Sequence, residues 1–217
     1  MHHCATMDHV DRLYNERYPT GVMYRPGVVR KIGIAAVAAL AVAGAIVLLT
    51  AADSRTSDVP TEDGRQALEL ANRWRELEPD IHSYVDASAV YFRFPSEKLV
   101  EAPLAADSMV IAAAPYINYT HPCAIHAISS CQAELANEPI QVTVIDESGQ
   151  TVKQKETTTM DNGFVELWLP RGSQYTLHFE ARGRSVETTA RTYSDSPTCL
   201  TNLQLERHDE NEEDHDA

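Results

Sequence analysis

A series of short alternating segments between Pro139 and Tyr193 constrains the fold of this chain more than any other feature. From Ile140 to Ile145, apolar and polar residues alternate, as they do in a strand with one buried face. Turn-forming residues recur at short intervals, in segments 146–149, 161–163 and 170–173. Such spacing predicts an antiparallel β-sandwich-like domain of immunoglobulin-like or transthyretin-like shape. We assign it to residues 137–205, with Cys199 just after the penultimate strand and the last strand over 200–205.

The residues before this domain follow a different pattern. Apolar side chains recur at helical spacing from residue 65, and Pro79 ends the helix that this spacing predicts. From Ile81 to Ala114, imperfect alternation predicts several short strands. We therefore expect a small helix-and-strand part over residues 65–136, after a polar linker over 53–64. The fold class predicted for the whole chain is α+β.

An uncharged apolar run, residues 32–52, lies near the N-terminus. It is longer than the core of a usual signal peptide and just long enough to span a bilayer. Arg30 and Lys31 precede it and Asp53 follows it, so the positive-inside rule keeps residues 1–31 in the cytoplasm and exports everything after the run. The run is a transmembrane helix if it stays uncleaved and a signal-peptide core if it is cleaved. Both alternatives place the rest of the chain outside the cytoplasm, either anchored to the membrane or released.

The charge of the chain excludes one class of partner. The formal net charge at pH 7 is −14, and nucleic-acid binding would need a basic stripe instead. Residues 206–217 are rich in Asp and Glu and predict a solvated, disordered tail. Met7 and Met23 are alternative start positions that the sequence leaves open.

The candidate functional site is a group of cysteines and histidines. Two cysteines and two histidines fall within segment 120–131, and Cys199 lies far downstream. A threonine and a proline at the start of the segment predict a short helix, which places Cys123 and His126 on one face and Cys131 about two turns further on. Thiolates and imidazoles are ligands of soft metal ions. The sequence therefore predicts a metal site made of these three cysteines and His126.

These residue types leave several kinds of chemistry open. Cu(I) accepts two or three thiolates with an imidazole as a further ligand, and zinc accepts a tetrahedral set of three cysteines and one histidine. Alternatively, Cys123 and Cys131 form a disulfide that Cys199 attacks, which would make the chain a thiol–disulfide redox protein. A structural disulfide beside an inert thiol is the third interpretation. The sequence does not decide whether His121 is also a ligand.

Motifs of hydrolytic and nucleotide-dependent enzymes do not occur in the sequence. It contains no G-x-S-x-G, no H-E-x-x-H and no Gly-rich phosphate loop. We therefore expect a binding protein and not an enzyme, apart from any redox activity of the thiols.

Three stretches carry a family resemblance. They are Ala114–Cys123 with His126, Cys131 and Glu134–Leu135 after it, Asp161–Phe164 with Leu167–Pro170, and Asp195–Thr201 with Leu203–Leu205. Together they resemble the CueP family of periplasmic copper-binding proteins over most of the chain after the apolar run. The family's three cysteines match Cys123, Cys131 and Cys199, and its motif histidine matches His126. The long N-terminal segment and the acidic tail depart from the family pattern.

The resemblance implies copper binding and copper tolerance outside the cytoplasm, with Cu(I) as the ion and zinc as the alternative. It also implies a protein of two parts with a β-rich C-terminal domain, in some members a homodimer. Storing copper, scavenging it and passing it to an exported acceptor protein are three roles that the sequence does not distinguish.

Overall fold

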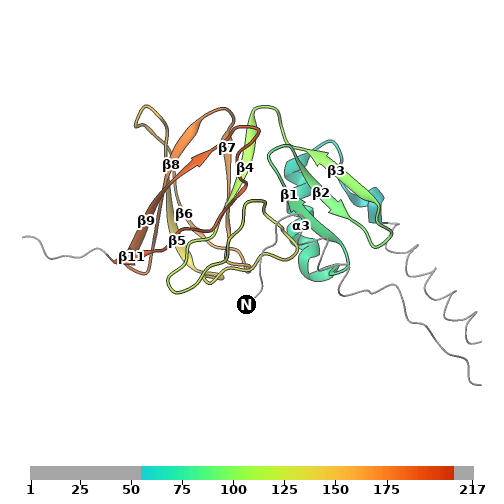
Figure 1. The fold of residues 1–217 in the computed structure, drawn as a ribbon, viewed down its shortest axis with the longest axis horizontal. Helices are drawn as coiled ribbons and strands as arrows, with labels where there is room; N and C mark the ends of the chain where they lie inside the picture. The colour runs from blue at the N-terminus through green and yellow to red at the C-terminus, as the bar shows by residue number, and fades with distance from the viewer. Residues whose placement is uncertain (1–54, 208–217) are drawn as a thin grey trace, which may run out of the picture.

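The computed structural model describes residues 55–207, which are mostly β-sheet with one α-helix among them (Figure 1). In chain order the elements are η1 (Arg55–Asp58), α3 (Gly64–Leu77), β1 (His82–Val85), β2 (Ala89–Arg93), β3 (Leu99–Pro103), β4 (Ser108–Ala113), β5 (Pro139–Ile145), β6 (Thr151–Thr158), β7 (Val165–Pro170), β8 (Gln174–Ala181), β9 (Arg184–Arg191), β10 (Cys199–Leu200) and β11 (Glu206–Arg207). The predicted membrane or signal segment, residues 32–52, and the segment before it lie outside the described residues. Within 55–207, no helix has the length and apolar character needed to cross a bilayer.

Helix α3 forms where the sequence combines an N-cap with an apolar face. The Asp63 carboxylate accepts hydrogen bonds from the backbone N–H groups of Arg65 (2.9 Å) and Gln66 (3.1 Å), which satisfies two of the unpaired donors at the helix start. The buried side chains recur at helical spacing and are Ala67, Leu68, Leu70, Ala71 and Trp74. They pack on the sheet β1-β2-β3, where the Trp74 ring meets Phe92 edge-on at 5.6 Å between centroids. The predicted helix is thus present within a residue or two of its expected bounds.

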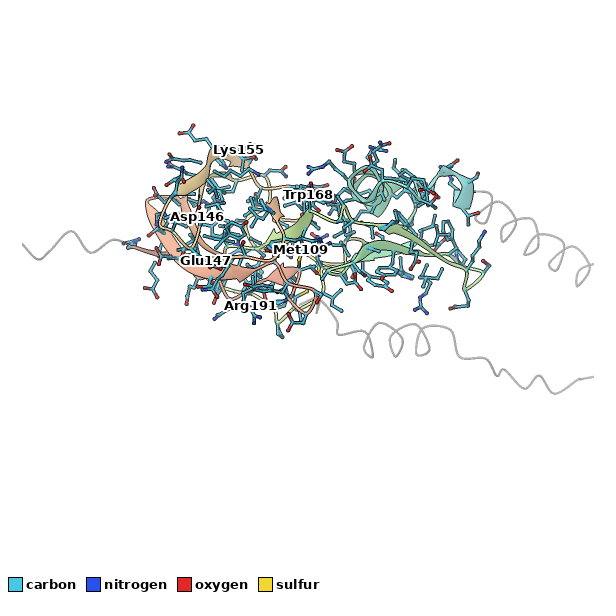
Figure 2. The ribbon with its side chains drawn as sticks, turned by 90° about the horizontal axis from the view of Figure 1, so that it is seen from above. Met109, Asp146, Glu147, Lys155, Trp168 and Arg191 are labelled. Atoms are coloured by element: carbon cyan, nitrogen blue, oxygen red, sulfur yellow. The ribbon has the colours of Figure 1, made fainter. Side chains whose placement is uncertain are left out.

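Strands β4 and β7 form a central layer between α3 with β1–β3 on one side and the large sheet on the other (Figure 1). Met109 and Ile111 on β4 face the large sheet, whereas Val110 between them packs with α3 and β1–β3. Side chains alternate between the two faces of a strand, so a strand that is apolar on both faces needs cover on both sides. Figure 2 labels Met109 and Trp168 near the middle of the molecule, where this layer lies. The short strand β10 joins the free edge of β4 in parallel register.

The large sheet has five strands in the order β11-β9-β8-β5-β6, all paired antiparallel. Strands β5 and β8 alternate buried and more exposed side chains, as the sequence pattern predicts. Their buried residues meet those of β4 and β7 in one core, which includes Val142, Val144, Leu167, Leu169, Leu177 and Phe179. The two sheets therefore pack face to face in a sandwich-like arrangement, and the expected antiparallel β-rich C-terminal part is confirmed in this form.

The short helix expected in segment 120–131 is not formed. Its backbone groups bond to distant strands: the Val85 N–H donates to the His126 carbonyl (2.9 Å), and the Thr198 N–H donates to the Ala124 carbonyl (3.0 Å). The segment is therefore an irregular loop, because strand partners satisfy the groups that would otherwise pair within a helix.

The end of the described chain also differs from the sequence prediction. In place of one strand over 200–205, β10 pairs with β4 and a single bridge joins Gln204 to Tyr116. Glu206 and Arg207, which the sequence assigns to the acidic tail, pair with β9 as strand β11.

Candidate metal centre

The loop that carries Cys123, His126 and Cys131 is fixed by the two strands beside it. His126 forms an isolated antiparallel bridge with Val85 at the end of β1. The Thr198 hydroxyl accepts a hydrogen bond from the His126 N–H (3.1 Å) and donates one to the Val85 carbonyl (2.7 Å). One buried hydroxyl therefore ties together the loop, β1 and the segment that precedes Cys199.

Cys199 reaches the loop because β10 is anchored on both sides. The Ala112 N–H of β4 donates to the Thr198 carbonyl (2.8 Å), and the Cys199 N–H donates to the Ala124 carbonyl (3.3 Å). The parallel pairing of β10 with β4 thus carries a cysteine from the end of the chain to the cysteines of the loop.

A carboxylate holds the segment that leads into the loop. Glu134 accepts hydrogen bonds from the backbone N–H groups of Ile117 (2.7 Å), Asn118 (2.8 Å) and Tyr119 (3.3 Å). These bonds lower the pKa of Glu134 below its ordinary value against the opposing effect of burial. The sequence places Glu134 in the family motif, and the structure shows its contact with the loop.

The cysteine and histidine side chains converge in two groups that share one member. The ligand atoms of His121, Cys123 and Cys131 lie within 4.8 Å of one another, and so do those of His126, Cys131 and Cys199. The Sγ atoms of Cys123 and Cys131 are 3.8 Å apart. The structure thus divides the four residues predicted from the sequence between two groups that share Cys131, and His121 belongs to the group of Cys123.

The redox state of Cys131 determines whether its sulfur can act as a thiolate ligand of a metal ion. Cys131 is disulfide-bonded in this structure, whereas Cys123 and Cys199, the other two cysteines among residues 55–207, are not bonded to it. A disulfide sulfur is not a thiolate ligand, so all three sulfurs are available to a metal only in the reduced protein.

The Cys123 and Cys199 thiols are electrostatically unequal. Hydrogen bonding with Cys199, helped by His121, lowers the pKa of Cys123 to about 6. Burial raises the pKa of Cys199 far above its ordinary value, and the neighbouring Cys123 adds to this. Cys123 is therefore the more acidic thiol of the pair, and Cys199 is the one that holds its proton more strongly.

Buried imidazole nitrogens face this cluster without hydrogen-bond partners. Both ring nitrogens of His126, which is fully buried, and Nε2 of His121 have none within the described structure. Burial, together with the charge of Arg75, lowers the pKa of His126 to about 3, so the ring is neutral and able to ligate a metal. Buried polar atoms normally have partners, and these orphaned nitrogens therefore fit a site that completes its bonding with a metal ion.

A polar group behind His126 has no counterpart in the sequence analysis. Asn72 on α3 donates to the Glu166 carboxylate on β7 (2.9 Å), whose Oε1 lies 3.9 Å from His126 Nε2. Burial raises the pKa of Glu166 to about 7. In the alternating pattern of β7, Glu166 falls on the face that the sequence assigns to solvent. In the fold, α3 covers this face, so the burial of Glu166 is seen only in the structure.

The fold and the site together define a β-rich protein with a largely buried candidate site for a soft metal ion. The chain belongs to the CueP family: the family model described as periplasmic copper-binding protein CueP matches residues 67–204. Among solved structures, the crystal structure of S.CueP is 29% identical in sequence, with a TM-score of 0.64, and the match covers 71% of this chain and 96% of that one. No curated protein matches.

The family assignment confirms the resemblance seen in the sequence. It supports a periplasmic copper-binding protein and, with it, a location outside the cytoplasm.

Proposed function

We propose that this protein binds Cu(I) outside the cytoplasm through the thiolates of Cys123, Cys131 and Cys199, with His126 in support, and acts in copper tolerance. The observation that carries the proposal is that Cys123 and Cys199 each lie in a group of candidate ligands with Cys131, and that buried imidazole nitrogens without hydrogen-bond partners belong to the same two groups. A convergence of this kind has no role in packing, because orphaned buried nitrogens cost stability.

The spacing of the Cys123 and Cys131 sulfurs suits two ligands of a three-coordinate ion. A planar ion with metal–sulfur bonds of about 2.3 Å, the usual length for thiolate ligands, holds its sulfurs about 4 Å apart. The 3.8 Å between Cys123 and Cys131 is close to this value. Cu(I) accepts three thiolates in this arrangement and is soft enough to prefer them.

Zinc fits less well. A structural zinc site needs four ligands around one point. The candidate ligands among the described residues form two overlapping groups of three and no group of four. Reaching a tetrahedral site would require the loop to shift away from its anchors on β1 and β10.

The test is a titration of the reduced full-length chain with Cu(I), without oxygen, against a chromophoric Cu(I) chelator. We expect one tight site, and we expect Cys199→Ser or Cys131→Ser to weaken it by about 100-fold or more, since loss of a group that only orients a ligand already costs 10- to 100-fold. Cys4→Ser, which removes the cysteine outside the motif, is the matched control and should bind as the unaltered chain does. No binding above the chelator background would refute the proposal.

One observation favours a second function, thiol–disulfide exchange. Cys123 has a pKa lowered to about 6 and lies 3.8 Å from Cys131, so its thiolate is placed to attack a disulfide there. If the reduced chain binds no Cu(I) but reduces a small disulfide, and Cys123→Ser abolishes this reaction, exchange is the function.

A further inference from the structure

The two groups of candidate ligands differ in their access to solvent. The group of His126, Cys131 and Cys199 is buried throughout, with exposed fractions of 0%, 0% and 2%. In the other group Cys123 is only partly buried, and its neighbours Pro122 and Ala124 are exposed. A metal ion from solvent therefore meets the group of His121, Cys123 and Cys131 first. We name this set the outer group and the buried set the inner group.

His121 has a buried nitrogen that the three-thiolate site does not use. Nε2 of His121 lacks a hydrogen-bond partner within the described structure, although the residue is only 9% exposed. The buried Phe164 ring stands beside both imidazoles, 4.6 Å from the His126 ring and 6.4 Å from the His121 ring between centroids. The two histidines thus line one site from different positions.

Separate anchors fix the two histidines. The Thr120 hydroxyl donates to the Thr201 carbonyl (2.6 Å) directly before His121, whereas His126 is held through Val85 of β1. Cys131 belongs to both groups, so an ion bound in one group can keep its bond to Cys131 while it passes to the other.

We propose that His121 is a transient copper ligand. The outer group receives Cu(I) from solvent, and the ion then passes inward by exchanging His121 for Cys199 while it stays bound to Cys131. This inference deepens the proposed function and rests on it. In the exchange the copper–nitrogen bond to His121 breaks and a bond from copper to the Cys199 sulfur forms. The proton of the Cys199 thiol leaves to solvent, and copper stays Cu(I) throughout. Cys123 and Cys131 remain bound, and His126 lies behind the final site.

Rates and affinities separate a transient ligand from a permanent one. A ligand that is bound only on the way in and out changes the uptake and release rates by the same factor, and their ratio, the affinity, stays the same. For His121→Ala we expect both rates to fall by about tenfold or more while the affinity changes by less than about threefold. For His126→Ala we expect the opposite pattern, in which affinity falls and the uptake rate constant is unchanged.

The experiment mixes the reduced full-length chain with a Cu(I)–chelator complex in a stopped-flow instrument and follows the chelator colour, with equilibrium competition measured on the same samples. His121→Gln provides a second variant that keeps a polar side chain of similar size, and circular dichroism verifies the fold of each protein. His178→Ala, on the outer face of β8, is the matched histidine control.

The outcomes discriminate between this inference and the proposed function. If either fold-competent His121 variant loses as much affinity as Cys131→Ser, His121 is a permanent ligand and the inference is wrong. Unchanged rates and affinity in both variants would also overturn it. If the unaltered chain fails to take copper from the chelator at equilibrium, the proposed function itself fails.

Discussion

At the scale of single residues, Cys123 and Cys199 show how burial gives two chemically identical thiols different pKa values. Cys199 is the more buried of the two and its pKa is raised, whereas the pKa of Cys123, nearer to solvent, is lowered. The reactive member of the pair is therefore the one nearer to solvent. This polarity suits an entry point for a metal ion, because only the thiolate is a metal ligand.

The pKa of Cys123 predicts its reactivity in the metal-free protein with Cys131 oxidised, which is the state that this pKa describes. We expect alkylation of Cys123 by iodoacetamide to rise with pH around a midpoint of about 6, because the thiolate is the reacting form. Peptide mass spectrometry after timed alkylation at pH 5 to 9 measures this. Cys199→Ala removes the group that lowers the pKa of Cys123 and should move the midpoint upward. A midpoint that stays near the ordinary value for a thiol would contradict the hydrogen-bonded pair.

At the scale of elements, the turn before β7 holds the position of Cys131. Gly163 has φ +82°, and a Cβ at this position would lie 2.8 Å from the Ala133 side chain and 2.9 Å from its backbone. The Ala133 N–H in turn donates to the Asn162 carbonyl (2.7 Å). The turn and the residues just after Cys131 are thus packed backbone against backbone.

Gly163→Ala should therefore destabilise the protein and disturb the site together. We expect a loss of about 2 kcal/mol or more in the free energy of unfolding, from the strained φ and the clash with Ala133. Gly149→Ala is the matched control, because Gly149 has the same φ of +82° and no atom within 4 Å of the added Cβ. It should lose about 1 kcal/mol, the backbone cost alone. Urea unfolding measures both, and equal losses would show that the contact with Ala133 is unimportant.

The raised pKa of Glu166 predicts how the free energy of unfolding depends on pH. Burial raises its pKa from the ordinary 4.5 to about 7 in the folded protein, so its carboxyl favours the folded state most below pH 4.5, and that contribution is lost as pH rises through 7. The free energy of unfolding should fall over this interval by up to about 3 kcal/mol from this group. Glu166→Gln should remove that fall, whereas exposed Glu187→Gln should keep it. Urea unfolding at pH 5 and pH 8 measures the difference, and parallel profiles for both variants would contradict a buried carboxyl.

Sequence patterns predicted the elements whose side chains repeat. Helix α3 and strands β5, β7 and β8 lie where periodicity placed them, because one buried face imposes a regular pattern. The loop at 120–131 was mistaken for a helix, since its hydrogen-bond partners on β1 and β10 are far away in the sequence. The burial of Glu166 was hidden for the same reason: the helix that covers it belongs to another part of the chain. The candidate ligands could be predicted from the sequence because cysteine and histidine are metal-ligand residue types whatever the fold around them.

At the scale of the whole molecule, the candidate centre lies where three parts of the fold meet. The loop with Cys123 and Cys131 bonds to β1, and Cys199 lies on β10 at the edge of the central layer. A metal ion bound there would link the α3 side of the molecule to the sandwich. Since the unfolded chain does not hold these ligands together, binding should stabilise the fold as a whole.

Copper should therefore raise the thermal stability of the reduced protein. At a free Cu(I) concentration 1,000 times the dissociation constant, we expect the free energy of unfolding to increase by about 4 kcal/mol. Thermal unfolding followed by the fluorescence of Trp74 and Trp168 measures this with and without Cu(I). Cys199→Ser should lose the gain, and Cys4→Ser should keep it. A melting temperature that copper leaves unchanged in the unaltered chain would show that the ion does not bridge these parts.

The position of Cys199 on β10 also determines when, during synthesis, all three proposed thiolate ligands are present. Synthesis proceeds from the N-terminus, and a nascent chain that has already formed α3 and the first four strands still lacks a cysteine that pairs only near the end of the described fold. The ribosome must therefore complete almost the entire molecule before the three sulfurs can meet. A chain that ends before Cys199 therefore lacks one of the three thiolates of the proposed site.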